Sequence, residues 1–114
     1  MACTQPDPRI KKIKIQTGVV KRITKEKDMY EKEALQIEKK IEKMQTDGTD
    51  AYVLRKQQEV LQESKMMGPD TLKRLRSAYE ELNRLVEGES DLAETEEYKA
   101  AKVALEAAKP LVEA

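Results

Sequence analysis

A repeat of mainly apolar residues, spaced by three and then four positions, runs from residue 13 to residue 44. Its members are Ile13, Gln16, Val20, Ile23, Lys27, Tyr30, Ala34, Ile37, Ile41 and Met44. Only Gln16 and Lys27 are polar, and no Gly or Pro stands between Val19 and Asp47. This spacing places one apolar stripe along a single helix. It therefore predicts one long helix whose stripe packs against partner helices.

Turn and cap residues divide the rest of the chain into two further helices. Asp7 and Pro8 predict the start of the first helix, at about 8–46, because Asp caps a helix and Pro suits its first position. Gly48 predicts its end, and Asp50 is expected to cap a second helix at about 50–87. Short turns make consecutive helices antiparallel.

The third helix is predicted at about 90–109, with Ser90 as its cap and Pro110 as its end. Its expected inner residues are Leu92, Thr95, Tyr98, Ala101, Leu105 and Ala108. The expected fold class is therefore all-α, an up-down-up three-helix bundle with long helices. We expect one domain over residues 1–114, with 1–6 and 111–114 disordered.

Gly68 and Pro69 interrupt the second helix, so we expect it to be kinked or broken there. Its expected inner side carries Leu54, Leu61, Leu72, Leu75, Leu82 and Leu85, widened by Val60, Met67, Ala78, Tyr79 and Val86. Neighbouring helical residues point about 100° apart, so two adjacent Met residues cannot both face one core. We therefore predict Met67 on the inner side and Met66 partly exposed.

Charge is abundant and unevenly distributed. Charged residues make up 39% of the chain and aromatic residues 4%, and the formal net charge is zero. Residues 1–46 hold 12 Lys and Arg against 7 Asp and Glu, whereas residues 87–114 hold 3 against 8. Between Arg9 and Lys27 there are eight bases and one acid, Glu26. This basic run is either a solvated helix face, a surface for an acidic protein, or, with less support, a nucleic-acid contact.

The composition argues against most catalytic chemistry. The chain has no His and one Cys, Cys3, so it lacks the commonest general base and cannot form an internal disulfide. No phosphate-binding loop or nucleophile motif occurs. The apolar runs are too short for a signal peptide or a membrane span. We expect a cytoplasmic protein that is not an enzyme and uses neither cofactor nor metal.

Four stretches, met in order between about residues 8 and 100, resemble the tubulin-folding cofactor A family. They are Thr17-Gly18-Val19-Val20-Lys21-Arg22, Met29-Tyr30-Glu31-Lys32-Glu33-Ala34, Leu61-Gln62-Glu63-Ser64-Lys65-Met66-Met67 with Pro69-Asp70, and Glu96-Glu97-Tyr98-Lys99. The resemblance implies a three-helix bundle that binds β-tubulin after its release from the cytosolic chaperonin. It also implies that the chain passes β-tubulin towards heterodimer assembly, without a cofactor.

The implied partner is therefore β-tubulin, with other tubulin-folding cofactors as further expected partners and neither nucleic acid nor membrane. Association with microtubules is a further expectation. Because tubulins are acidic, we predict that Lys21, Arg22 and Lys25 steer encounter. The predicted contact patch around the proline consists of Glu63, Lys65, Met66 and Asp70. The alternative is a scaffold that self-associates through an apolar stripe.

Overall fold

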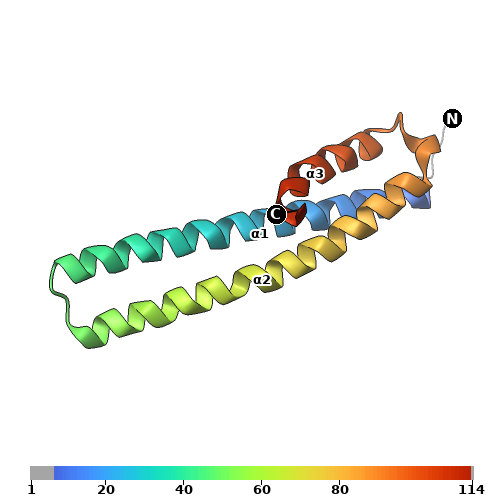
Figure 1. Cartoon of the computed structure of the whole chain (residues 1–114). Coiled ribbons are helices and arrows are strands. Elements are labelled where there is room, and N and C mark those ends of the chain that lie inside the picture. The colour runs from blue at the N-terminus through green and yellow to red at the C-terminus, as the bar shows by residue number, and fades with distance from the viewer. Residues whose placement is uncertain (1–6, 114) are drawn as a thin grey trace. The chain divides into compact units, whose positions relative to one another are not determined.

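The computed structural model describes residues 7–113, which form helices and turns without a strand. Their order is α1 (Pro8–Thr46), α2 (Ala51–Gly88), the short 3₁₀ helix η1 (Ser90–Leu92) and α3 (Glu96–Glu113) (Figure 1). The all-α prediction is confirmed. The predictions made for residues 1–6, including Cys3, and for residue 114 lie outside the described residues.

Local sequence signals set both ends of α1. The backbone N–H of Arg9 donates to Asp7 Oδ1 at 2.9 Å, which is the cap that the sequence predicts. At the other end, Gly48 has a φ of +70°, and the N–H of Thr49 reaches back to the Met44 carbonyl at 2.9 Å. A left-handed residue with this six-to-one bond is a Schellman motif, a conformation that Gly adopts without steric cost.

Helix α2 continues through Gly68 and Pro69, so the break that the sequence allowed is absent. Pro69 has no N–H to donate to the Lys65 carbonyl, and one bond of the helical ladder is therefore missing. The helix nevertheless continues for about five turns on each side of Pro69. The Thr71 hydroxyl donates to the Met67 carbonyl at 2.8 Å just after the proline.

The third helix begins and ends later than the sequence predicts. Ser90 begins η1 rather than capping a long helix, and α3 starts at Glu96. Thr95 is the cap of α3, because its Oγ1 accepts a hydrogen bond from the N–H of Tyr98 at 3.2 Å. At the other end α3 runs through Pro110 to Glu113.

The burial of apolar side chains explains why Pro110 does not end α3. Leu111 and Val112 pack against the hydrophobic core, and Arg76 Nε donates to the Val112 carbonyl at 3.3 Å. These contacts compensate for the backbone bond that Pro110 cannot make. The expectations of a helix end at 109 and of disorder over 111–113 were therefore wrong.

The described residues group into two compact units, and residues 7–24 with 72–113 belong to the first. In its described part, segments of α1 and α2 pack with α3 around one hydrophobic core. This core consists of Ile13, Val20, Ile23, Leu75, Ala78, Leu82, Val86, Leu92, Ala101, Ala104, Leu105 and Ala108. Three helices around a common core are the bundle that the repeat predicts. Of the six residues predicted to face inward around the third helix, Leu92, Ala101, Leu105 and Ala108 belong to the core, and Tyr98 packs against it.

The second unit, residues 25–71, is a hairpin of two antiparallel helical segments joined by the turn at 47–50 (Figure 1). Its interior is much less buried. The α1 repeat continues through half-buried Tyr30, Ala34, Ile37 and Met44, and Ile41 is the one buried hydrophobic residue among those described in this unit. Two helices alone cannot enclose an apolar stripe as three can. The apolar side chains of this unit are therefore less completely buried than those of the first unit.

The inner side of α2 in this hairpin differs from the prediction. The least exposed positions are Leu54, Gln57, Leu61, Ser64 and Gly68. Val60 and Met67, which we expected to face inward, are 44% and 49% exposed, and Met66 is 66% exposed. The placements of Val60 and Met67 were therefore wrong, because the inner stripe combines Leu54 and Leu61 with small and polar residues.

Candidate partner-binding surface

Exposed apolar side chains are concentrated in the hairpin. Nine large hydrophobic residues are exposed in the described part of the chain, and seven of them fall between residues 25 and 71. These seven are Met29, Leu35, Tyr52, Val53, Val60, Met66 and Met67. Single exposed apolar residues are ordinary, whereas a cluster of them marks a surface for a partner. The hairpin is therefore the candidate binding element.

One flank of the hairpin has a shallow groove of about 200 Å³, which we call the Val60 groove. Its lining residues are Tyr30, Glu33, Val60, Glu63, Ser64 and Met67. Val60 and Met67 lie two helical turns apart on α2, so they form the apolar part of this flank. Two carboxylates, those of Glu33 and Glu63, stand beside them. The groove thus presents apolar surface next to negative charge.

The Lys65 side chain is engaged in an ion pair across the two helices. Its Nζ lies 3.1 Å from Glu38 Oε1, and both side chains are about half exposed. Exposed pairs of this kind contribute little to stability, about 0–1 kcal/mol. Their main effect here is to make this part of the hairpin polar, in contrast to the Val60 groove.

The seven predicted site residues are all exposed, but the structure does not bring them together as one patch. They are Lys21, Arg22, Lys25, Glu63, Lys65, Met66 and Asp70. Lys21 and Arg22 belong to the three-helix unit, and the other five belong to the hairpin. Among these five only Glu63 lines the Val60 groove. Their roles in binding stay predictions.

Sequence reasoning missed the groove residues Tyr30, Glu33, Val60 and Met67 as candidates for binding. The available signal was the spacing of Val53, Val60 and Met67, which recur every seven residues. A seven-residue spacing places residues on one face of a helix, but it does not say whether that face is the inner stripe or a flank beside it. The way in which α2 pairs with α1 decides whether this face points inward or lies on a flank. The sequence of α2 alone does not show that pairing.

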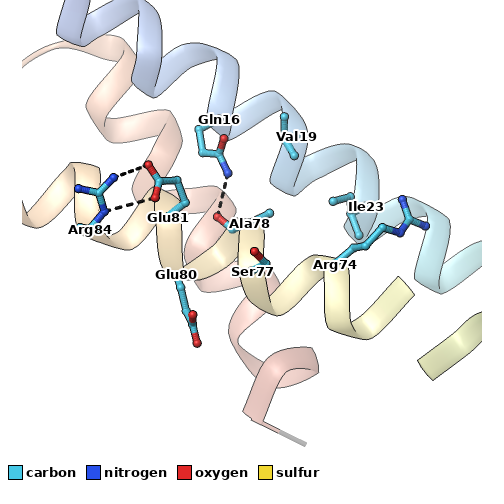
Figure 2. Close-up of a pocket in the computed structure, with 9 residues that line it drawn as sticks. All are labelled: Gln16, Val19, Ile23, Arg74, Ser77, Ala78, Glu80, Glu81 and Arg84. Atoms are coloured by element: carbon cyan, nitrogen blue, oxygen red, sulfur yellow. Dashed lines mark hydrogen bonds and ion pairs between the residues drawn. The ribbon is translucent and has the colours of Figure 1, made fainter. Parts of the chain in front are cut away.

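A second groove, of about 640 Å³, lies within the three-helix unit (Figure 2). Val19 and Ile23 of α1 line it together with Arg74, Ser77, Ala78, Glu80, Glu81 and Arg84 of α2. Gln16 also lines it and donates from Nε2 to the Ala78 carbonyl at 3.1 Å. Glu81 bonds the Arg84 guanidinium and raises the pKa of Arg84. Its charges balance, with Arg74 and Arg84 against Glu80 and Glu81, so this groove selects no partner by net charge.

A cluster around Arg9 joins the start of α1 to the end of α2. The Arg9 guanidinium lies 2.7 Å from Asp7 Oδ2, 2.7 Å from Glu89 Oε2 and 2.9 Å from Asp91 Oδ2. Hydrogen bonds from Arg9 lower the pKa of Asp7, and the three carboxylates raise that of Arg9. We interpret the cluster as structural, because its charges satisfy one another.

The described residues contain no group of three or more His, Cys, Asp and Glu side chains that could hold a metal ion. None of the described helices combines the length and apolar character that a membrane span requires. The arrangement supports binding through helix faces, and the hairpin offers the apolar surface for it.

Comparisons with known proteins agree with the resemblance seen in the sequence. The family model for tubulin binding cofactor A matches residues 8–105. Human tubulin-specific chaperone A is 56% identical over 103 residues, covering 90% of this chain and 95% of its own length. Tubulin-folding cofactor A from Arabidopsis thaliana is 46% identical over 88 residues, covering 77% of this chain and 73% of its own length.

Solved structures show the same similarity. The structure of human tubulin chaperone cofactor A superposes with a TM-score of 0.79 at 54% identity, covering 90% of this chain and 99% of that one. The crystal structure of tubulin folding cofactor A from Arabidopsis thaliana gives a TM-score of 0.83 at 36% identity, with 90% and 97% covered. The similarity therefore extends over nearly the whole of both chains.

Proposed function

Because the chain belongs to the tubulin binding cofactor A family, we propose that it is a tubulin-folding chaperone that captures β-tubulin folding intermediates. It holds them without catalysing a covalent reaction and passes them on towards heterodimer assembly. Human tubulin-specific chaperone A, a relative at 56% identity, supports the choice of tubulin as client. The proposed location is the cytoplasm, in association with microtubules, and other tubulin-folding cofactors are proposed as further partners.

One observation carries the proposal, namely the exposed apolar surface of the hairpin. A holding chaperone must offer apolar area to an incompletely folded client and remain soluble without it. The hairpin combines both properties, because Val60, Met66 and Met67 are exposed among charged neighbours. Met side chains are flexible and polarisable and adapt to varied surfaces. Such a surface suits an incompletely folded client, whose own surface still changes.

Charge supports the choice of an acidic client. Lys21, Arg22 and Lys25 are exposed on α1, and tubulins are acidic. A cluster of one sign attracts a partner of the other sign over about a Debye length and speeds encounter at low salt. These bases are proposed to steer the client, and the hairpin is proposed to hold it.

The experiment that tests this function is capture of purified α- and β-tubulin, each released from denaturant by dilution, on the immobilised chain. Selective retention of β-tubulin is the expected result. Retention of neither tubulin at low salt, by protein whose circular dichroism shows folded helix, would refute the proposal. Equal retention of both would refute the β-tubulin selectivity.

The same apolar surface is also suited to covering by a second copy, which is the scaffold alternative. Sedimentation velocity of the protein alone separates the two functions. A chaperone is expected to sediment as a monomer or a compact dimer, whereas a scaffold forms larger, concentration-dependent assemblies.

A further inference from the structure

The inner side of α2 in the hairpin is only partly apolar, because polar and small residues share it with Leu54 and Leu61. Between residues 54 and 68 its inner positions include Gln57, Ser64 and Gly68, whereas Val60 and Met67 lie exposed on the flank. The Ser64 hydroxyl oxygen is buried and has no hydrogen-bond partner among the described residues. An amphipathic helix normally turns its apolar side chains inward. Val60 and Met67 are instead left uncovered on the flank, where they form the apolar part of the Val60 groove.

The three-helix unit shows what covers such a pair of helices. There α3 packs its small and apolar residues Ala101, Ala104, Leu105 and Ala108 into the core with α1 and α2. These positions follow the spacing of three and four that puts side chains on one face. The hairpin contains no third helix. A helix from a partner is therefore the element that would complete it.

The charges at the Val60 groove specify the flanks of such a helix. Glu33 and Glu63 line the groove, and no Lys or Arg of the described chain does so. Two bases that are close in sequence to groove residues, Lys32 beside Glu33 and Lys56 four residues before Val60, have other partners. Lys32 pairs with Asp28 at 3.1 Å, and Lys56 lies 5.4 Å from the Tyr52 ring centroid. Carboxylates beside an apolar strip favour a partner with positive charge.

We propose that the Val60 groove binds an amphipathic helix of a partner, with apolar residues recurring every three and four positions and Lys or Arg beside them. On α2 the exposed Val53 precedes the groove residues Val60 and Met67 at the same seven-residue spacing, and the rise from Val53 to Met67 is roughly 21 Å at the α-helical rise per residue. The partner helix therefore has about four turns. This inference rests on the proposed function at one point, the source of the helix. Under that function, the helix is a segment of the β-tubulin client.

Synthetic peptides test the groove without any tubulin. One 16-residue peptide, of about four turns, has Leu and Ala at the spacing of three and four and Lys at the flanking positions. Its matched control has the same apolar residues and Glu in place of each Lys. We expect the Lys peptide to bind at low salt at least about tenfold more tightly than the Glu peptide. Amide shifts of the labelled protein are expected to cluster around Val60 and Met67.

Three variants locate the binding and test its charge preference. Met67→Lys is expected to weaken binding of the Lys peptide to the groove at least about tenfold, because it places a base inside the apolar strip. Gln58→Lys, at an exposed position that does not line the groove, adds the same charge as a control and is expected to change binding less than about twofold. The double variant Glu33→Lys with Glu63→Lys is expected to reverse the preference towards the Glu peptide.

The outcomes separate this inference from the proposed function. Equal binding of the two peptides, or equal loss with Met67→Lys and Gln58→Lys, overturns the inference. β-Tubulin capture that Met67→Lys leaves unchanged overturns the assignment of the helix to β-tubulin, although the chaperone function then stands. If the Lys peptide binds at the groove but the protein captures no β-tubulin, the proposed chaperone function is refuted, and the groove is still supported as a site for a basic amphipathic helix. A dimer in sedimentation that Met67→Lys dissociates shows a second copy in the groove and overturns the inference.

Discussion

Arg9 Nη1 donates to Glu89 Oε2 at 2.7 Å, across 80 residues of sequence. The same guanidinium bonds Asp7, whose side chain also caps α1. One side chain thereby links the first turn of α1 to the segment that follows α2. Without Arg9 the carboxylates of Asp7, Glu89 and Asp91 would repel one another.

Replacing Arg9 by Met is therefore expected to lower the melting temperature slightly at neutral pH. Hydrogen bonds from Arg9 depress the pKa of Asp7 below its ordinary value of 3.8, so this stabilisation is present above that value and is lost as pH falls through the lower, folded-state pKa. Thermal melts of both proteins at neutral pH and well below pH 3.8 check this. A difference that stays constant down to the lowest pH would contradict the role of Asp7.

Removing the side chain of Leu82 tests where the hydrophobic core lies. Leu82 is fully buried in the three-helix unit, and Leu82→Ala is expected to cost about 2–5 kcal/mol of unfolding free energy. Leu61 is a half-buried residue of the hairpin, so Leu61→Ala is expected to cost clearly less. Denaturant titrations of the two variants measure the difference, and equal losses would show that both units are equally packed.

The helix caps were predicted correctly where one local signal stood alone. Asp7 and Gly48 each have no competitor nearby, and the structure places them as expected. Ser90 and Thr95 are both good cap residues, and the sequence alone favoured the wrong one. The end of α3 was missed because burial of Leu111 and Val112, a tertiary contact, outweighs the local effect of Pro110.

The correction at Thr95 gives a direct test. Thr95→Ala is expected to cost about 1 kcal/mol, because the N–H of Tyr98 loses its capping partner. Ser90→Ala is the matched control, since no capping hydrogen bond from Ser90 is seen at η1, where Glu89 holds the cap position. Chemical denaturation of both variants measures the two costs. A larger loss for Ser90→Ala would show that α3 begins earlier than Glu96.

The binding surface was harder to predict than the caps. Val60 and Met67 were expected on the inner side of α2, and their exposure became clear only from the pairing of α2 with α1. Of the residues predicted for the contact patch, Glu63 alone lines the Val60 groove, and its role in binding stays a prediction; the second carboxylate of the groove, Glu33, belongs to the other helix. Sequence patterns report which residues share a helix face, but two helices must be placed together before a groove between them can be recognised.

The same substitution at two glycines is expected to have opposite effects. Gly68 lies in α2, and a Cβ built there meets no atom within 4 Å, so Gly68→Ala should stabilise the protein by about 0.5–1 kcal/mol. Gly48 has a φ of +70°, and Gly48→Ala should destabilise it by about 1–2 kcal/mol. Equilibrium unfolding in urea gives both values. Destabilisation by Gly68→Ala would mean that this position needs a conformation other than the helical one.

Reversing charge at Lys21 and Arg22 tests steering. Both side chains are exposed on α1, so replacing them by Glu should leave helicity unchanged and slow association with β-tubulin about tenfold at low salt. Added salt screens the attraction of the parent protein, so the two rates should converge as ionic strength rises. Stopped-flow association at several salt concentrations measures this, with circular dichroism as the folding control. Equal rates at the lowest salt would remove these two bases from the encounter, and a difference that persists at high salt would assign them to the bound contact instead.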